Sequence, residues 1–146
     1  MMSRLGVWFM GVLARVPLPV LRAMGAALGR VLFVLVVPRR KIALRNLELC
    51  FPQASVEQRT QWARESFIVF CQTWLDRSWL WSAPQSVVEQ RVKLQGAVHE
   101  LDGDVPTIIF APHFYGLDAG GLVLPLRTSR AFTSIFSTHP DPVIDA

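Results

Sequence analysis

The sequence predicts an α/β protein, in which N-terminal membrane-associated helices precede the front part of a mostly parallel sheet with flanking helices. Residues 1–45 are apolar and basic, residues 55–82 carry a helical pattern, and residues 91–136 alternate strand-type and helix-type segments. About three strands are recognisable, which is too few to complete such a sheet, so we expect the domain to be incomplete. The predicted parts are a membrane-associated segment over 1–45 and the N-terminal part of an α/β domain over 46–146.

The charge of the chain is unevenly distributed. Residues 1–45 hold eight basic residues and no acidic one, whereas residues 46–146 hold seven basic and eleven acidic residues. A basic and apolar segment fits an anionic membrane surface, and no nucleic-acid-binding module is recognisable, so we expect no nucleic-acid partner. The basic residues for which we expect membrane contact are Arg15, Arg22, Arg30, Arg39, Arg40 and Lys41.

The apolar part of this segment consists of two stretches, residues 5–14 and 20–37, separated by Pro17 and Pro19. Neither stretch is an uninterrupted run long enough to span a membrane. No small-x-small cleavage site follows the first stretch, so a signal peptide is not expected. Four arginines fall within an arc of about 80° on a helical wheel, namely Arg4, Arg15, Arg22 and Arg30.

This basic stripe favours helices that lie in the membrane interface. One tilted span, with Arg39–Lys41 on the cytoplasmic side, is an alternative. An ordinary buried pair of helices is a second alternative, because apolar helices also pack in protein cores.

Two further helices are predicted before residue 85. The first covers about residues 40–49 and is followed by Pro52, and the second covers residues 55–82 before Pro84. Ser55 and Gln58 have the spacing of a capping box, which predicts that the second helix begins there. This helix carries tryptophans that favour core packing or, alternatively, a membrane-interface position: Trp62, Trp74, Trp79 and Trp81.

The remaining residues carry alternating signals. We predict strands at 91–96, 105–111 and 131–136, a short helix at 98–101, a helix from Asp118 and a loop at 137–142. Cys50 and Cys71 lie among apolar residues without a metal-type spacing, which predicts two reduced thiols in the core. His99 is expected at the surface and His139 in the final loop.

His113 is the histidine placed where a strand is expected to give way to a turn, and Asp118 follows it after four residues. A neutral imidazole can take a proton from a hydroxyl that attacks a carbonyl carbon, and a carboxylate can orient that imidazole. On a continuous helix the two side chains would diverge by about 140°, so the pair requires a turn between them. The alternative is a structural histidine whose ring is satisfied by a backbone carbonyl.

The residues Pro112-His113-Phe114-Tyr115-Gly116-Leu117-Asp118 resemble the H-x4-D/E motif of the lysophospholipid-acyltransferase-like superfamily. More closely, the chain resembles the N-terminal half of the bacterial lipid A biosynthesis acyltransferases, which are lauroyl or myristoyl transferases. The resemblance covers nearly the whole chain. Besides the motif, the segments that carry it are Pro17–Pro19, Arg39–Ala43 with Asn46–Leu47, Phe51–Gln53, the long helix, and Ser134–Asp145.

The resemblance implies transfer of an acyl chain from an acyl carrier protein or acyl-CoA thioester to a hydroxyl of a lipid A precursor, in lipopolysaccharide biosynthesis. The expected location is the cytoplasmic face of the bacterial inner membrane. His113 would be the general base and Asp118 its orienting partner, without a metal or a prosthetic cofactor. The expected substrate-binding residues are Phe114, Gly116, Gly120 and Gly121, of which the last two could offer backbone N–H groups to an oxyanion.

Some residues depart from the family pattern. Tyr115–Asp118 stands where many members carry Gly-Asn-Trp-Glu, which keeps the carboxylate, and Ser137-Thr138 stands where some members carry arginine. Members are also considerably longer than this chain. Two alternatives therefore remain, namely a glycerophospholipid acyltransferase with the same catalytic pair and a truncated, non-catalytic membrane-associated protein. No Gly-x-Ser-x-Gly elbow is present, which disfavours a serine hydrolase.

Overall fold

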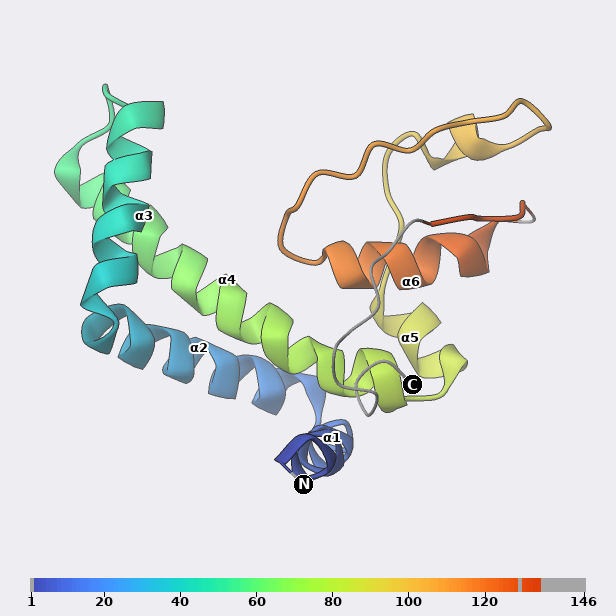
Figure 1. The fold of residues 1–146 in the computed structure, drawn as a ribbon, viewed down its shortest axis with the longest axis horizontal. Helices are drawn as coiled ribbons and strands as arrows, with labels where there is room; N and C mark the ends of the chain where they lie inside the picture. Colours follow the sequence, from blue (N-terminus) through green and yellow to red (C-terminus); the bar gives the residue numbers. More distant parts are fainter. Residues whose placement is uncertain (1, 129, 135–146) are drawn as a thin grey trace. The chain divides into compact units, whose positions relative to one another are not determined.

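The structure, a computed structural model, describes residues 2–128 and 130–134. Its helices, shown in Figure 1, are α1 (Met2–Leu13), α2 (Leu18–Leu35), α3 (Val37–Cys50), α4 (Val56–Ser82), α5 (Gln85–Arg91), the 3-10 helix η1 (Val98–Leu101) and α6 (Leu117–Arg127). The chain divides into two compact units. We call Val16–Asp76 the helical unit, and we call Met1–Arg15 with Arg77–Ala146 the site unit, because it contains His113 and Asp118.

The predicted parallel sheet is wrong, because no strand occurs within residues 2–128 and 130–134. Residues 105–111 and 131–134 are irregular or extended, and the signal at 91–96 coincides with the end of α5 and an irregular segment. A strand forms only where neighbouring backbone supplies its hydrogen bonds, and an apolar run does not specify that neighbour. Residues 135 and 136 of the predicted last strand, the predicted loop 137–142 and His139 lie outside the described residues.

The two predicted N-terminal helices are confirmed as α1 and α2, and α2 begins directly after Pro17. Pro19 lies in the first turn of α2, where its missing N–H costs no helical hydrogen bond. With a mean hydropathy of 1.7 over 18 residues, of which 22% are buried, α2 is long and apolar enough to cross a membrane. Arg22 and Arg30 interrupt this helix, so the finding is compatible with the predicted absence of an uninterrupted apolar run and leaves the tilted span as an alternative.

One face of α2 consists of buried residues at every fourth position, namely Leu21, Gly25, Gly29 and Phe33. This face packs against α4 within the helical unit. A Cβ added at Gly25 would lie 2.8 Å from the Cα of Gln72, and one added at Gly29 would lie 2.5 Å from the Cα of Ile68. Because the obstructing atoms belong to the backbone of α4, the two helices approach more closely than any residue with a side chain would permit.

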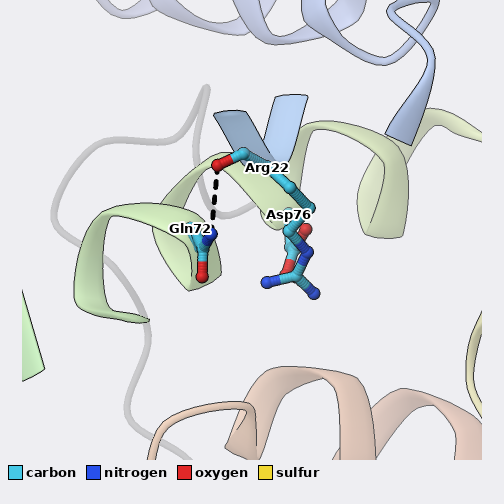
Figure 2. Close-up of polar contacts among 3 residues, drawn as sticks. All are labelled: Arg22, Gln72 and Asp76. Atoms are coloured by element: carbon cyan, nitrogen blue, oxygen red, sulfur yellow. Dashed lines mark hydrogen bonds and ion pairs between the residues drawn. The ribbon is translucent and has the colours of Figure 1, made fainter. Parts of the chain in front are cut away.

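Polar contacts join the same two helices, as Figure 2 shows. Gln72 Nε2 donates a hydrogen bond to the backbone oxygen of Arg22 at 3.0 Å, and Arg22 Nη2 forms an ion pair with Asp76 Oδ2 at 2.9 Å. The side chain of Asp76 is only 11% exposed. A carboxylate so far removed from water requires a partner, so Arg22 contributes to the packing of α2 on α4.

The end of α2 is surrounded by aromatic and cationic side chains. The rings of Phe33 and Phe67 meet edge to face with their centroids 5.5 Å apart. The guanidinium groups of Arg40 and Arg64 each lie 5.5 Å from the centroid of the Phe33 ring. Arg40 Nη1 also donates to the backbone oxygen of Phe33 at 3.0 Å, which caps the last turn of α2 with a positive charge.

The predicted capping box is confirmed at the start of α4. Ser55 N–H donates to Gln58 Oε1 at 3.0 Å, and Gln58 N–H donates to Ser55 Oγ at 3.2 Å. The tryptophans of this helix divide between the two interpretations. Trp79 is buried at 3% exposure, as core packing predicts, whereas Trp62, Trp74 and Trp81 are exposed at 37%, 45% and 62%.

The site unit has a small apolar core to which α1, α4, α5 and α6 contribute. Its buried apolar residues are Met10, Leu13, Trp79, Leu80, Val88 and Val123. Helix α5 was not predicted, and it begins after Pro84, whose fixed φ suits the residue that precedes a helix. Arg127 Nη2 donates to the backbone oxygen of Glu89 at 2.8 Å and so connects α6 to α5.

The predicted buried strand at 105–111 is instead an exposed extended segment. Ile108 is 98% exposed and Phe110 is 89% exposed. Pro106 and Pro112 cannot donate backbone hydrogen bonds. Arg130 donates to the backbone oxygens of Leu101 and Val105. An arginine side chain therefore satisfies the carbonyl group of Val105, which a neighbouring strand would satisfy in a sheet.

The two cysteines differ from each other. Cys71 is buried, as predicted, and burial raises the pKa of its thiol. Cys50 is exposed at the end of α3, so the prediction of a core thiol is wrong there. The predicted short helix at 98–101 is confirmed as η1, and His99 on it is exposed as expected.

Candidate active site

His113 lies at the centre of a tight turn that ends the extended segment. The backbone N–H of Phe114 donates to the oxygen of Pro112 at 2.8 Å, which closes a three-residue γ-turn around His113. The side chain of His113 is exposed. The imidazole is therefore presented to the surroundings by a turn, as a group that exchanges protons with a substrate must be.

A second turn follows immediately and leads into α6. Leu117 N–H donates to the oxygen of Phe114 at 3.3 Å, and Gly116 has φ 86° and ψ 6° at the third position of this four-residue turn. These values are those of a type II turn, which strongly favours glycine at that position. Gly116 thus has a conformational role, in which it reverses the chain between His113 and Asp118.

Asp118 lies in the first turn of α6, where the helix dipole favours a negative charge. Its Oδ2 accepts a hydrogen bond from Arg77 Nε at 2.5 Å. The guanidinium of Arg77 also lies 5.9 Å from the centroid of the Trp81 ring, one turn further along α4. Asp118 is thus held by a side chain 41 residues earlier in the chain.

The structure brings His113 and Asp118 to the two ends of one turn but does not pair them directly. Among the described residues, no hydrogen bond joins the imidazole of His113 to the carboxylate of Asp118, and Arg77 is the partner of that carboxylate. Within residues 2–128 and 130–134, Oδ1 of Asp118 has no hydrogen-bond partner. Among the described residues, Arg77 therefore engages one carboxylate oxygen, and the other can accept a second donor.

The other expected substrate-binding residues surround this turn. Phe114 is 75% exposed. A Cβ added at Gly120 or Gly121 would meet no atom within 4 Å, so open space adjoins α6 at both positions. The N–H of Gly120 donates to the oxygen of Gly116 at 3.0 Å, which makes it the first hydrogen bond of α6 rather than a free donor.

The basic residues expected at the membrane fall into two groups. Arg22 and Arg40 have partners inside the helical unit, as described above. The other four are exposed, namely Arg15, Arg30, Arg39 and Lys41. No group of three or more histidine, cysteine or acidic residues that could hold a metal ion occurs in the part of the chain that the structure describes.

Sequence reasoning missed several residues that the structure makes important. Gly25 and Gly29 have the small-x-x-x-small spacing of close helix pairs, so this signal was present in the sequence. The partnership of Arg77 with Asp118 leaves no local signal, because the two residues are far apart in the chain.

Comparisons of the sequence with known proteins identify several relatives. The palmitoleoyltransferase of lipid A biosynthesis from Escherichia coli (strain K12) is 31% identical over 126 residues, which cover 82% of this chain and 41% of that protein. The lauroyltransferase of lipid A biosynthesis from the same strain is 24% identical over 144 residues, covering 97% of this chain and 46% of that protein. A lipid A biosynthesis acyltransferase from Haemophilus influenzae is 26% identical over 144 residues, covering 97% and 45%.

The chain thus spans less than half the length of these curated relatives, from 41% to 46%. No solved structure matches it. The sequence model of the bacterial lipid A biosynthesis acyltransferases matches residues 1–146, which is the whole chain. The chain therefore belongs to the bacterial lipid A biosynthesis acyltransferase family.

Proposed function

We propose that the protein transfers an acyl chain from a thioester, carried by acyl carrier protein or coenzyme A, to a hydroxyl of a lipid A precursor. The observation that carries the proposal is the family match over residues 1–146, within which an exposed histidine and a carboxylate flank the turn before α6. Two relatives are named for the acyl group they transfer, palmitoleoyl and lauroyl.

His113 is the proposed general base. Its imidazole removes the proton of the acceptor hydroxyl as the hydroxyl oxygen attacks the thioester carbonyl carbon. The new ester C–O bond forms, the C–S bond breaks, and the proton passes from the imidazolium to the leaving thiolate. No covalent acyl-enzyme is required, because the acceptor oxygen attacks the donor directly. The exposed position of His113 in its γ-turn supports this role.

Asp118 is the proposed orienting group for the imidazole, and Arg77 is its positioning residue. Arg77 holds Oδ2 of Asp118, which leaves Oδ1 to accept the ring N–H of His113 when substrate is bound. A carboxylate fixed in this way stabilises the imidazolium that forms during the reaction. Apo sites commonly have loose catalytic hydrogen bonds, which tighten when substrate binds.

The acyl chain has an apolar surface available beside His113. Phe114 directly follows the histidine and is 75% exposed, and Phe110 in the preceding segment is 89% exposed. Large apolar side chains exposed together mark surfaces that receive an apolar partner. We assign these two rings to the contact with the donor's acyl chain.

The proposed location is the cytoplasmic face of the bacterial inner membrane. The length and hydropathy of α2 support membrane association, and the exposed Arg39 and Lys41 follow its C-terminal end, as the positive-inside tendency predicts for a cytoplasmic flank. We expect the protein to remain in the membrane pellet after extraction with alkaline carbonate. Its complete release into the supernatant would contradict an inserted helix.

An acyl-transfer assay tests the proposed activity. The protein, expressed from its complete reading frame and purified in detergent, is supplied with an acyl-thioester and a lipid A precursor, and mass spectrometry follows the gain of one acyl group. Parallel reactions with acyl carrier protein and coenzyme A donors identify the donor. Lysophosphatidic acid as acceptor identifies a glycerophospholipid acyltransferase instead.

The matched variants are His113→Ala and His99→Ala, since both histidines are exposed in the site unit. Loss of a general base lowers rates by about 10²–10⁴, so His113→Ala should lose activity to that extent. His99→Ala should keep the rate of the wild type. A folded His113→Ala variant with an unchanged rate would disprove the proposed role of His113.

A further inference from the structure

A cavity of about 570 Å³ lies within the site unit, between α1, the end of α4 and α5. Its wall is partly apolar and includes Trp8 and Val12 from α1 and Val87 from α5. Two arginines, Arg15 and Arg91, also line it, and none of the lining residues is acidic. The cavity therefore combines a partly apolar wall with two arginines and no acidic lining residue.

Arg91 is the unusual member of this lining. Its Nη1 is buried, yet it has no hydrogen-bond partner among the described residues. The guanidinium lies 5.1 Å from the centroid of the buried Trp79 ring, which fixes its orientation. A buried charged donor without an acceptor is unfavourable, because the hydrogen bond that it made to water has not been replaced. An anionic acceptor in the cavity would remove this deficit.

Arg15 adds a second positive charge to the lining of the cavity, which also favours an anionic ligand. Arg15 follows α1 and is exposed, so its guanidinium is accessible from outside the cavity. Two guanidinium groups that line one cavity are suited to a phosphate group, whose oxygens accept several charge-assisted hydrogen bonds at once.

The apolar side of the cavity continues onto the outer surface of α1. Trp8 is 64% exposed and Val12 is 41% exposed, and Leu5 and Phe9 on the same helix are exposed at 63% and 50%. A ligand whose phosphate reaches the arginines would therefore carry an apolar portion along α1. The cavity volume lies in the range of about 300–1,000 Å³ that is usual for small-molecule sites.

We propose that this cavity binds the phosphate group of an anionic membrane phospholipid, with Arg91 and Arg15 as donors and Trp8 and Val12 in contact with the lipid's apolar portion. The site goes beyond the proposed acyl transfer, because it includes none of the residues assigned to that reaction. It adds a specific lipid contact to the general attraction between a basic segment and an anionic bilayer.

Native mass spectrometry of the detergent-purified protein, titrated with dioleoylphosphatidylglycerol, measures this binding. Arg91→Gln should weaken lipid binding about tenfold, because a charge-assisted donor is lost. Arg4→Gln is the matched control, since Arg4 is exposed on α1 outside the cavity and its loss changes the net charge equally. It should bind the lipid as the wild type does. Dioleoylglycerol, which lacks the phosphate, should bind far more weakly to all three proteins.

Two outcomes would overturn the proposal. The first is equal affinity of Arg91→Gln and Arg4→Gln for the phospholipid. The second is full displacement of the lipid by millimolar inorganic phosphate, which would make the cavity a site for a free anion. If Arg91→Gln does not fold, Arg15→Gln replaces it, because the Arg15 side chain is exposed and less involved in packing. The same weakening is then expected, and its absence counts against the site.

Discussion

The helical unit and the extended segment at 105–111 differ in how their backbone groups are satisfied. Within Val16–Asp76, the backbone groups of α2, of α3 and of most of α4 form hydrogen bonds inside each helix. Helix α2 also packs closely against the backbone of α4 at Gly25 and Gly29. In the extended segment the internal hydrogen bond comes from a side chain, because the Thr107 hydroxyl donates to the backbone oxygen of Val105. Its carbonyl groups are satisfied in part by the side chain of Arg130, and its apolar residues are exposed.

This difference shows which sequence signals suffice on their own. A helix needs only its own residues and an apolar face, so its periodicity predicts it well. A strand needs a partner from elsewhere in the chain, and its composition does not name that partner. The candidate catalytic histidine, His113, follows the extended segment at 105–111. Asp118, its proposed carboxylate partner, lies on helix α6.

The largest expected effect concerns the contact between α2 and α4. Gly29→Ala should destabilise the protein by about 1–3 kcal/mol, because its Cβ would lie 2.5 Å from the backbone of α4 and the helices must separate. Thermal unfolding in detergent micelles, followed by circular dichroism, measures the change. Gly6→Ala is the control, since no atom lies within 4 Å of its added Cβ. It should be neutral or stabilising, and an equal loss in both variants would refute close packing at Gly29.

The next effect concerns the ion pair that holds the candidate carboxylate. Arg77→Ala should lower kcat about tenfold while leaving KM unchanged, because Asp118 loses the donor that positions it. Arg77→Lys should restore part of the rate, since it keeps the charge but not the geometry of the guanidinium. Steady-state kinetics of acyl transfer provide both constants. If only KM changes, Arg77 contacts substrate and does not position Asp118.

A smaller effect is expected at the start of α4. Ser55→Ala removes the hydroxyl that accepts the N–H of Gln58, and loss of such a cap costs about 1 kcal/mol. Ser55→Asn keeps a capping group and serves as the control. Chemical or thermal unfolding midpoints distinguish the two variants. Equal midpoints for Ser55→Ala and the wild type would show that the capping box does not contribute to stability.

The smallest expected effect is a pH dependence of stability that arises from Glu57 in the first turn of α4. The pKa of Glu57 is lowered from its ordinary value of 4.5, first by a hydrogen bond from its own backbone N–H and then by the Ser55 hydroxyl. A lowered pKa in the folded state stabilises the fold above the ordinary pKa, and this stabilisation is lost as the pH falls through the folded-state value. The Tm advantage of wild type over Glu57→Gln should therefore shrink as the pH falls below about 4.5. A difference that is constant with pH contradicts this linkage.

The same contrast explains what could be predicted from the sequence. The capping box at Ser55, the extent of α4 and the helix after Gly116 depend on local residues, and they were predicted closely. The turn between His113 and Asp118 was also expected from Gly116. The extended, exposed conformation of residues 105–111 and the ion pair between Arg77 and Asp118 depend on residues distant in the chain. No local pattern could therefore predict them.

We propose that His113 and Asp118 act as one catalytic unit, although Arg77 is the partner of Asp118 in the structure. A double-mutant cycle of acyl-transfer rates with His113→Ala, Asp118→Asn and the double variant tests it most directly. Residues that act as a unit lose activity together, so the double variant should be no slower than His113→Ala alone. Losses that multiply in the double variant would show that the two residues act independently and would contradict the claim.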